Sequence, residues 1–126
     1  MERIPLDPEG VKSWLANAAQ KYEQLSRDLA EAKAERTSRE LIYKEAYAQS
    51  LLSSVGKSRE MREADALLGA SDKHNLLVES QNKVTRLESE LKALSKAIDI
   101  ALALLGTQRK ADFAAHNGGG WQCQIY

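Results

Sequence analysis

The chain has 126 residues and carries 18 acidic and 18 basic side chains, so its formal net charge at pH 7 is zero. A zero net charge excludes the long-range attraction of a strongly basic nucleic-acid binder, and any anion binding must come from local clusters. Aromatic residues make up 6% of the chain, charged residues make up 29%, and both prolines precede residue 9, which favours long helices over a compact mixed fold.

A helix start is encoded near the N-terminus. Asp7 supplies a capping carboxylate, Pro8 suits the first helical position, and Glu9 places an acid in the first turn. We expect this first helix to cover residues 8–52, because a stripe of residues three and four apart continues along it. The stripe is apolar, becomes basic in its middle, and is then apolar again. Its members are Val11, Leu15, Ala18, Tyr22, Leu25, Leu29, Ala32, Arg36, Arg39, Tyr43, Ala46, Tyr47, Leu51 and Val55.

Two breaks follow the first helix. Gly56 suits a helix C-terminal cap, and Ser58 suits the N-cap of a short helix that we expect at residues 59–68. A second break lies at residues 69–72, where Ser71 or Asp72 can cap the last helix, which we expect at residues 73–115.

The last predicted helix carries the clearest fold signal in the chain. Its apolar residues form one stripe, with alternating spacings of three and four from Val84 onward, and such a stripe requires a partner helix in this chain or in another copy. We therefore predict an all-α fold, an elongated helical hairpin or bundle that self-associates through its C-terminal helix. The stripe consists of Leu77, Val84, Leu87, Leu91, Leu94, Ile98, Ala101 and Leu105.

The segment from Ile98 to Leu105 is apolar on nearly every side, which indicates packing on more than one face. Two interpretations fit this pattern, the core of a helical bundle and a subunit interface beyond the intramolecular contact. The candidate interface residues are Leu94, Ile98, Ile100, Ala101, Leu102, Leu104 and Leu105.

Residues 117–126 differ in composition from the rest of the chain. Asn117 and three glycines cannot continue a helix, and we expect a flexible hinge there. Beyond the hinge, Trp121, Ile125 and Tyr126 are candidates for docking onto a neighbouring subunit or another protein. The alternative is a disordered end that folds against the chain's own bundle.

The chain contains no convincing catalytic motif. Residues 56–58 read Gly-Lys-Ser like the end of a phosphate-binding loop, but Leu51 stands where that loop needs its first glycine. Glu60 and Glu63 lie one turn apart, as in all-helical metal-dependent pyrophosphatases, yet no convincing second acidic pair accompanies them. We therefore expect no enzymatic activity, no cofactor and no bound metal.

The location of the protein is indicated by its cysteine content and its hydropathy. Cys123 is the single cysteine and cannot form an internal disulfide, which fits a reducing compartment. The first seven residues lack an apolar signal-peptide core, and the longest apolar run, residues 100–105, is too short to span a membrane. We expect a cytoplasmic protein without a membrane partner.

Basic residues gather in the middle of the first helix and around the turn that follows it. Two tyrosines lie among them, and aromatic faces stack on single-stranded bases. Acidic residues alternate with these bases, however, and the alternative is an ordinary solvated face. The candidate DNA-binding residues are Arg36, Arg39, Tyr43, Lys44, Tyr47, Lys57, Arg59 and Arg62.

The order of these elements resembles the phage recombination mediators of the UvsY type. The resemblance covers roughly residues 20–115 and consists of layout and spacing. Its parts are an amphipathic first helix, the basic segment with Tyr43, Lys44 and Tyr47, the turn at Gly56, the short charged helix, and a leucine-rich final helix.

This resemblance implies a non-enzymatic homo-oligomer, in the form of a ring, that binds single-stranded DNA. It also implies that the protein loads a RecA-like recombinase onto strands covered by single-strand-binding protein, in the host cell cytoplasm if the protein is phage-encoded. The family's DNA contacts correspond here to Lys44, while Ala46 stands where a second base is expected. The alternative functions are a structural coiled-coil adaptor and a small inhibitor or regulator that acts through protein–protein contacts.

Overall fold

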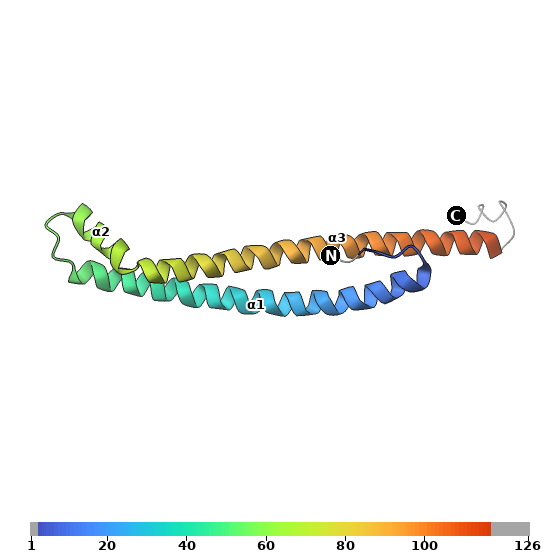
Figure 1. Cartoon of the computed structure of the whole chain (residues 1–126), viewed down its shortest axis with the longest axis horizontal. Helices are drawn as coiled ribbons and strands as arrows, with labels where there is room; N and C mark the ends of the chain where they lie inside the picture. Colours follow the sequence, from blue (N-terminus) through green and yellow to red (C-terminus); the bar gives the residue numbers. More distant parts are fainter. Residues whose placement is uncertain (1–2, 117–126) are drawn as a thin grey trace. The chain divides into compact units, whose positions relative to one another are not determined.

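The computed structural model describes residues 3–116, with side chains described as far as Thr107. Within this range the chain forms three helices and no strand: α1 (Pro8–Ser53), α2 (Arg59–Gly69) and α3 (Ser71–His116) (Figure 1). The prediction of an all-α fold is therefore confirmed. The predicted helix ends are correct to within two residues.

The start of α1 is capped as predicted, because Asp7 Oδ2 accepts a hydrogen bond of 2.8 Å from the backbone N–H of Gly10. Gly10 has a role in this cap. A Cβ atom at that position would lie 2.7 Å from Asp7 Oδ1 and 2.8 Å from the Pro5 side chain. The glycine thus leaves room for the capping carboxylate and the residues that precede it.

The turn between α1 and α2 corrects one prediction and confirms another. Ser58 is the N-cap of α2, and its hydroxyl accepts a hydrogen bond of 3.1 Å from Met61 N–H. Gly56, by contrast, is not the C-cap of α1, because that helix already ends at Ser53. A Cβ atom on Gly56 would lie 3.0 Å from Met61 Cβ and 3.1 Å from Arg62 N. The glycine is therefore suited to a close approach between the turn and α2.

The break between α2 and α3 is shorter than predicted. Only Ala70 is non-helical, and its N–H donates to Ala66 O at 3.0 Å while its carbonyl accepts from His74 N–H at 2.9 Å. Ser71 and Asp72 consequently belong to α3 and do not cap it, contrary to the prediction. Because Ala70 hydrogen-bonds to both helices, one residue is enough to end α2 and begin α3.

The chain divides into two compact units, to which α1 and α3 both contribute. Unit 1 comprises Met1–Gln24 and Leu91–Tyr126, and unit 2 comprises Leu25–Glu90. Within each unit α1 and α3 lie side by side and run in opposite directions (Figure 1).

The core of unit 1 consists of aliphatic residues and one tryptophan. Trp14 is buried although the sequence analysis left it out of the stripe, and Tyr22, which was included, is 42% exposed. Trp14 and Leu15 fit the periodicity equally well, because both Val11–Trp14–Ala18 and Val11–Leu15–Ala18 combine one spacing of three with one of four. Periodicity alone therefore does not predict which of these two residues is buried. The buried residues are Val11, Trp14, Ala18, Leu94, Ala97, Ala101 and Leu105.

The core of unit 2 confirms the apolar stripe of α3 and contains one buried polar residue. Ser80 is 2% exposed and lies between Leu77 and Val84, where its hydroxyl donates to Leu77 O at 2.7 Å. Val55, predicted to continue the stripe of α1, is 94% exposed because α1 has already ended. The buried apolar residues are Leu25, Ala32, Ala66, Ala70, Leu77, Val84 and Leu87.

Candidate nucleic-acid interface

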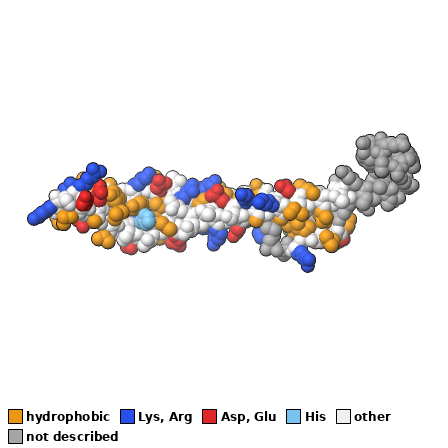
Figure 2. Space-filling model, turned by 90° about the horizontal axis from the view of Figure 1, so that it is seen from above, with side chains coloured by type: hydrophobic (Ala, Val, Ile, Leu, Met, Phe, Trp, Pro, Cys, Tyr) orange, Lys and Arg blue, Asp and Glu red, His pale blue; other side chains and the backbone are white. Residues whose placement is uncertain are grey.

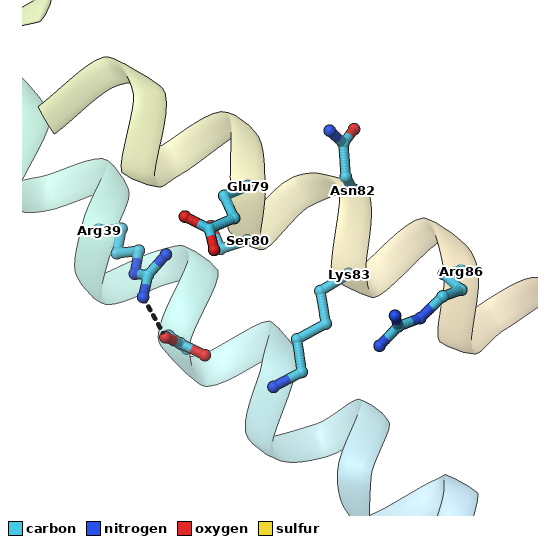
Figure 3. Close-up of a pocket in the computed structure, with 7 residues that line it drawn as sticks. Arg39, Glu79, Ser80, Asn82, Lys83 and Arg86 are labelled. Carbon is cyan, nitrogen blue, oxygen red and sulfur yellow. Dashed lines mark ion pairs between the residues drawn. The ribbon is translucent and has the colours of Figure 1, made fainter. Parts of the chain in front are cut away.

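A polar groove with a volume of about 510 Å³ lies in unit 2 and is lined by residues of α1 and α3 (Figure 3). The two helix sequences explain its position. The stripe of α1 changes from apolar to basic residues here, and the stripe of α3 has a serine in place of a large aliphatic residue, so no aliphatic pair fills the space. The groove is lined by Glu35, Arg39, Glu79, Ser80, Asn82, Lys83 and Arg86.

Arg39 connects the two helices at this groove. Its Nη2 atom lies 2.6 Å from Glu35 Oε1, one turn earlier on α1, and its Nη1 atom donates to Leu76 O of α3 at 2.8 Å. The charge of Arg39 is thus compensated by Glu35, and its guanidinium satisfies a backbone carbonyl. Arg39, which was predicted to bind DNA, therefore has a structural role in joining α1 to α3.

Lys83 and Arg86 are the remaining basic residues of the polar groove. Both side chains extend from α3 toward α1, whereas Asn82 points away from α1 (Figure 3). Both residues are exposed, and in the described part of the chain neither side chain forms an ion pair or a hydrogen bond. They are not among the predicted DNA-binding residues. The signal in the sequence is their position next to the apolar stripe of α3, and they lie beside the part of α1 where that helix's stripe is basic.

The predicted aromatic residues are neighbours, and Tyr43 also contacts α3. The ring centroids of Tyr43 and Tyr47 lie 6.3 Å apart with an edge-to-face angle of 73°. Tyr43 also lies 5.2 Å from the ring of His74, at an angle of 67°. Both tyrosines are half-buried, so part of each ring is used in packing and part remains open to solvent.

The other predicted bases differ in their contacts. Lys44 pairs with Glu40 at 3.2 Å and Arg59 pairs with Glu63 at 2.9 Å, each across one helical turn. Such exposed pairs contribute about 0–1 kcal/mol and are easily exchanged for other anions. The bases for which no ion pair is found within residues 3–107 are Arg36, Lys57 and Arg62.

All eight predicted DNA-binding residues belong to unit 2. Figure 2 shows that basic and acidic side chains are interspersed over the face in view. Any binding of a polyanion therefore depends on local groups of bases, as the zero net charge also requires.

The predicted interface residues of α3 fall into three groups by exposure. Ile100 is 60% exposed and Leu102 is 53% exposed, while Ile98 and Leu104 are half-buried. The others, Leu94, Ala101 and Leu105, are buried in unit 1. The docking residues predicted in the tail, Trp121, Ile125 and Tyr126, lie outside the described residues.

Among the described residues, no cluster of three or more His, Cys, Asp or Glu side chains has the arrangement of a metal site. Within the described part of the chain, no helix combines the length and the hydropathy that a membrane span requires. Comparisons with protein-family models, curated proteins and solved structures give no match to this chain.

Proposed function

We propose that this protein is a non-enzymatic recombination-mediator protein that binds single-stranded DNA and assists the loading of a RecA-like recombinase onto strands covered by single-strand-binding protein. The observation that supports DNA binding is that three of the predicted bases, Arg36, Lys57 and Arg62, have no intramolecular ion pair in the described part of the chain. They belong to unit 2, together with half-buried Tyr43 and Tyr47. Cations and aromatic faces are the two components of binding without sequence preference.

Binding of this kind is expected to be weak for one chain. The phosphates would contact the unpaired bases first, and the exposed pairs Lys44–Glu40 and Arg59–Glu63 would exchange partners at small cost. Each neutralised phosphate releases counterions, so affinity falls steeply with salt. The exposed faces of the tyrosines would stack on bases whatever their identity.

The proposal includes self-association through α3, in a ring or another closed assembly. Ile100 and Leu102 are large apolar side chains that unit 1 leaves exposed. Complete burial of such a side chain is worth roughly 1.5–3 kcal/mol, and covering the part that is still exposed gains about half of that. In an assembly, weak basic groups on several copies act together on one strand, which raises the overall affinity without new contacts.

Fluorescence anisotropy with a labelled oligothymidine tests the DNA-binding proposal. The triple variant Arg36→Gln, Lys57→Gln, Arg62→Gln is expected to bind more weakly and to lower the slope of log affinity against log salt by about 2, since each phosphate contact on a single strand contributes about 0.7. The matched control removes three positive charges from unit 1, at Lys12, Lys92 and Lys96. A wild-type protein that does not bind the strand at low salt would contradict the proposal.

Sedimentation velocity tests the assembly. The double variant Ile100→Ser, Leu102→Ser is expected to have a smaller mass than the wild type, while Leu41→Ser, Leu67→Ser, which changes exposed residues of unit 2, is expected to keep the wild-type mass. A wild-type protein that is monomeric at micromolar concentration would contradict self-association.

A second candidate function is an adaptor or regulator that acts by protein–protein contact. Several large apolar residues at the end of α1, in the turn that follows it and on α2 are exposed, and exposed apolar groups of this kind are typical of protein-binding surfaces. A protein that fails to bind DNA but retains its assembly would favour this function. The residues are Leu52, Val55, Met61, Leu67 and Leu68, with exposed fractions of 87%, 94%, 55%, 56% and 75%.

A further inference from the structure

The polar groove contains a charge arrangement that its structural role does not explain. Arg39 and Glu35 neutralise each other, and Arg39 also hydrogen-bonds to Leu76 O, so this pair accounts for the connection between the helices. Lys83 and Arg86 take no part in that connection. Their side chains nevertheless extend across the groove toward α1, not outward like Asn82 (Figure 3).

The two cations of α3 lie close to each other along the helix. Lys83 and Arg86 are three residues apart, so they lie on the same side of α3 with an axial separation of about 4.5 Å. Beneath them Ser80 is buried, and its hydroxyl proton is already donated to Leu77 O. The two cations are therefore the donors that the α3 side of this groove offers to an anion.

The lining of the groove favours an anionic ligand over an apolar or cationic one. None of the seven lining residues is aliphatic or aromatic, which is unlike a pocket for an apolar small molecule. The lining carries three basic and two acidic side chains, of which Arg39 and Glu35 pair with each other. The remaining charged side chains, Lys83, Arg86 and Glu79, leave the groove with a net positive charge.

We propose that the polar groove binds consecutive phosphates of a single-stranded nucleic-acid backbone through Lys83 and Arg86, and that Glu79 weakens this binding by repulsion. This inference rests on the proposed function and adds contacts on α3 to the bases predicted on α1 and α2. The strand would then be held by both long helices of unit 2, with its bases free to reach the tyrosines of α1.

The test measures binding of labelled oligothymidine to the full-length protein by anisotropy over a range of salt concentrations. The variant Lys83→Gln, Arg86→Gln is expected to lower the salt slope by about 1.4, the value for two lost phosphate contacts. The control Lys92→Gln, Lys96→Gln removes the same charge from exposed positions of the same helix outside the groove, and is expected to change the slope by less than about 0.3. Helix content by circular dichroism checks that both variants remain folded.

Glu79→Gln provides a second measurement with the opposite sign. If the groove binds phosphate, removal of this carboxylate is expected to raise the affinity several-fold, and a lower affinity would overturn the inference. Inorganic phosphate is the third probe. If it displaced the oligonucleotide at an equal concentration of phosphate groups, the groove would be a small-anion site and the proposal of a strand would be wrong.

The outcomes separate the two proposals. A wild-type protein that binds DNA while the groove variant and the lysine control behave alike would overturn the groove inference and leave the proposed function standing. A wild-type protein that does not bind DNA would overturn both.

Discussion

Units 1 and 2 each contain a part of α1 and a part of α3, but their centres differ in chemistry. In unit 1 the centre is closed by apolar residues, among which Val11, Leu94 and Ala101 are 0–2% exposed. In unit 2 the apolar contact is interrupted by Ser80 and by the Arg39–Glu35 pair, and the polar groove lies at this interruption. The contact between two helices can thus be apolar in one part and polar in another without a break in either helix.

The free energies of these contacts show why unit 2 tolerates polar residues between its apolar ones. A buried leucine contributes roughly 1.5–3 kcal/mol, whereas a solvent-exposed hydrogen bond such as that from Arg39 to Leu76 O contributes about 0.5–1.5 kcal/mol. This hydrogen bond therefore offsets part of the aliphatic contact that is missing between α1 and α3.

The largest effect is expected in the apolar core of unit 1. Leu94→Ala should lower the free energy of unfolding by about 2–5 kcal/mol, because Leu94 is 2% exposed and its removal leaves a cavity. Urea denaturation, followed by circular dichroism, measures the loss. Leu102→Ala on the exposed side of the same helix is the control, and an equal loss in both variants would show that exposure does not separate core from surface in this unit.

A smaller loss is expected for Gly69→Ala in unit 2. A Cβ atom on Gly69 would lie 2.9 Å from Ser50 Cβ, so α1 and α2 would have to move apart, at a cost of about 1–3 kcal/mol. Adding Ser50→Gly should restore part of the loss in a double-mutant cycle.

Gly106 of α3 provides the matched control for this prediction. A Cβ atom there has no neighbour within 4 Å, so Gly106→Ala should raise the stability by about 0.5–1 kcal/mol. The two substitutions are expected to change the stability in opposite directions, and a stabilising Gly69→Ala would contradict the close contact between α1 and α2.

Arg39→Gln tests the polar connection in unit 2 directly. The substitution removes the ion pair with Glu35 and the hydrogen bond to Leu76 O, and should lower the stability by about 1–1.5 kcal/mol. Arg59→Gln removes an ion pair of similar length at an exposed position, and should change the stability by less than about 0.5 kcal/mol. Thermal unfolding measures the change in Tm for both variants. Equal changes would show that Arg39 contributes no more to stability than an exposed ion pair does.

The smallest effect is expected for Ser80→Ala. The hydroxyl of Ser80 donates only to Leu77 O of its own helix, and alanine has the higher helix propensity, so the stability should change by less than about 1 kcal/mol. Chemical denaturation provides the measurement. A loss above about 2 kcal/mol would show that the hydroxyl, and not Arg39, is the main polar contact of the interruption.

The sequence alone predicted the features that depend on neighbours along the chain. The spacing of apolar residues predicted the helices and most of the buried stripe of α3, and the short-range hydrogen-bonding capacity of Asp7 and Ser58 predicted two of the helix starts. These signals act over one or two turns of helix, so they can be recognised without knowing what lies opposite. The clustering of bases likewise selected unit 2 as the candidate site.

Tertiary structure decided what depends on which residues face each other across two helices. Gly56 and Gly69 are matched to close contacts with Met61 and Ser50, not to a special backbone conformation. Arg39 could be recognised as a connecting residue only once its partner, the carbonyl of Leu76, was placed beside it. The register between α1 and α3 brings together Arg39 and Leu76, which are 37 positions apart, and periodicity along one helix carries no information about that register.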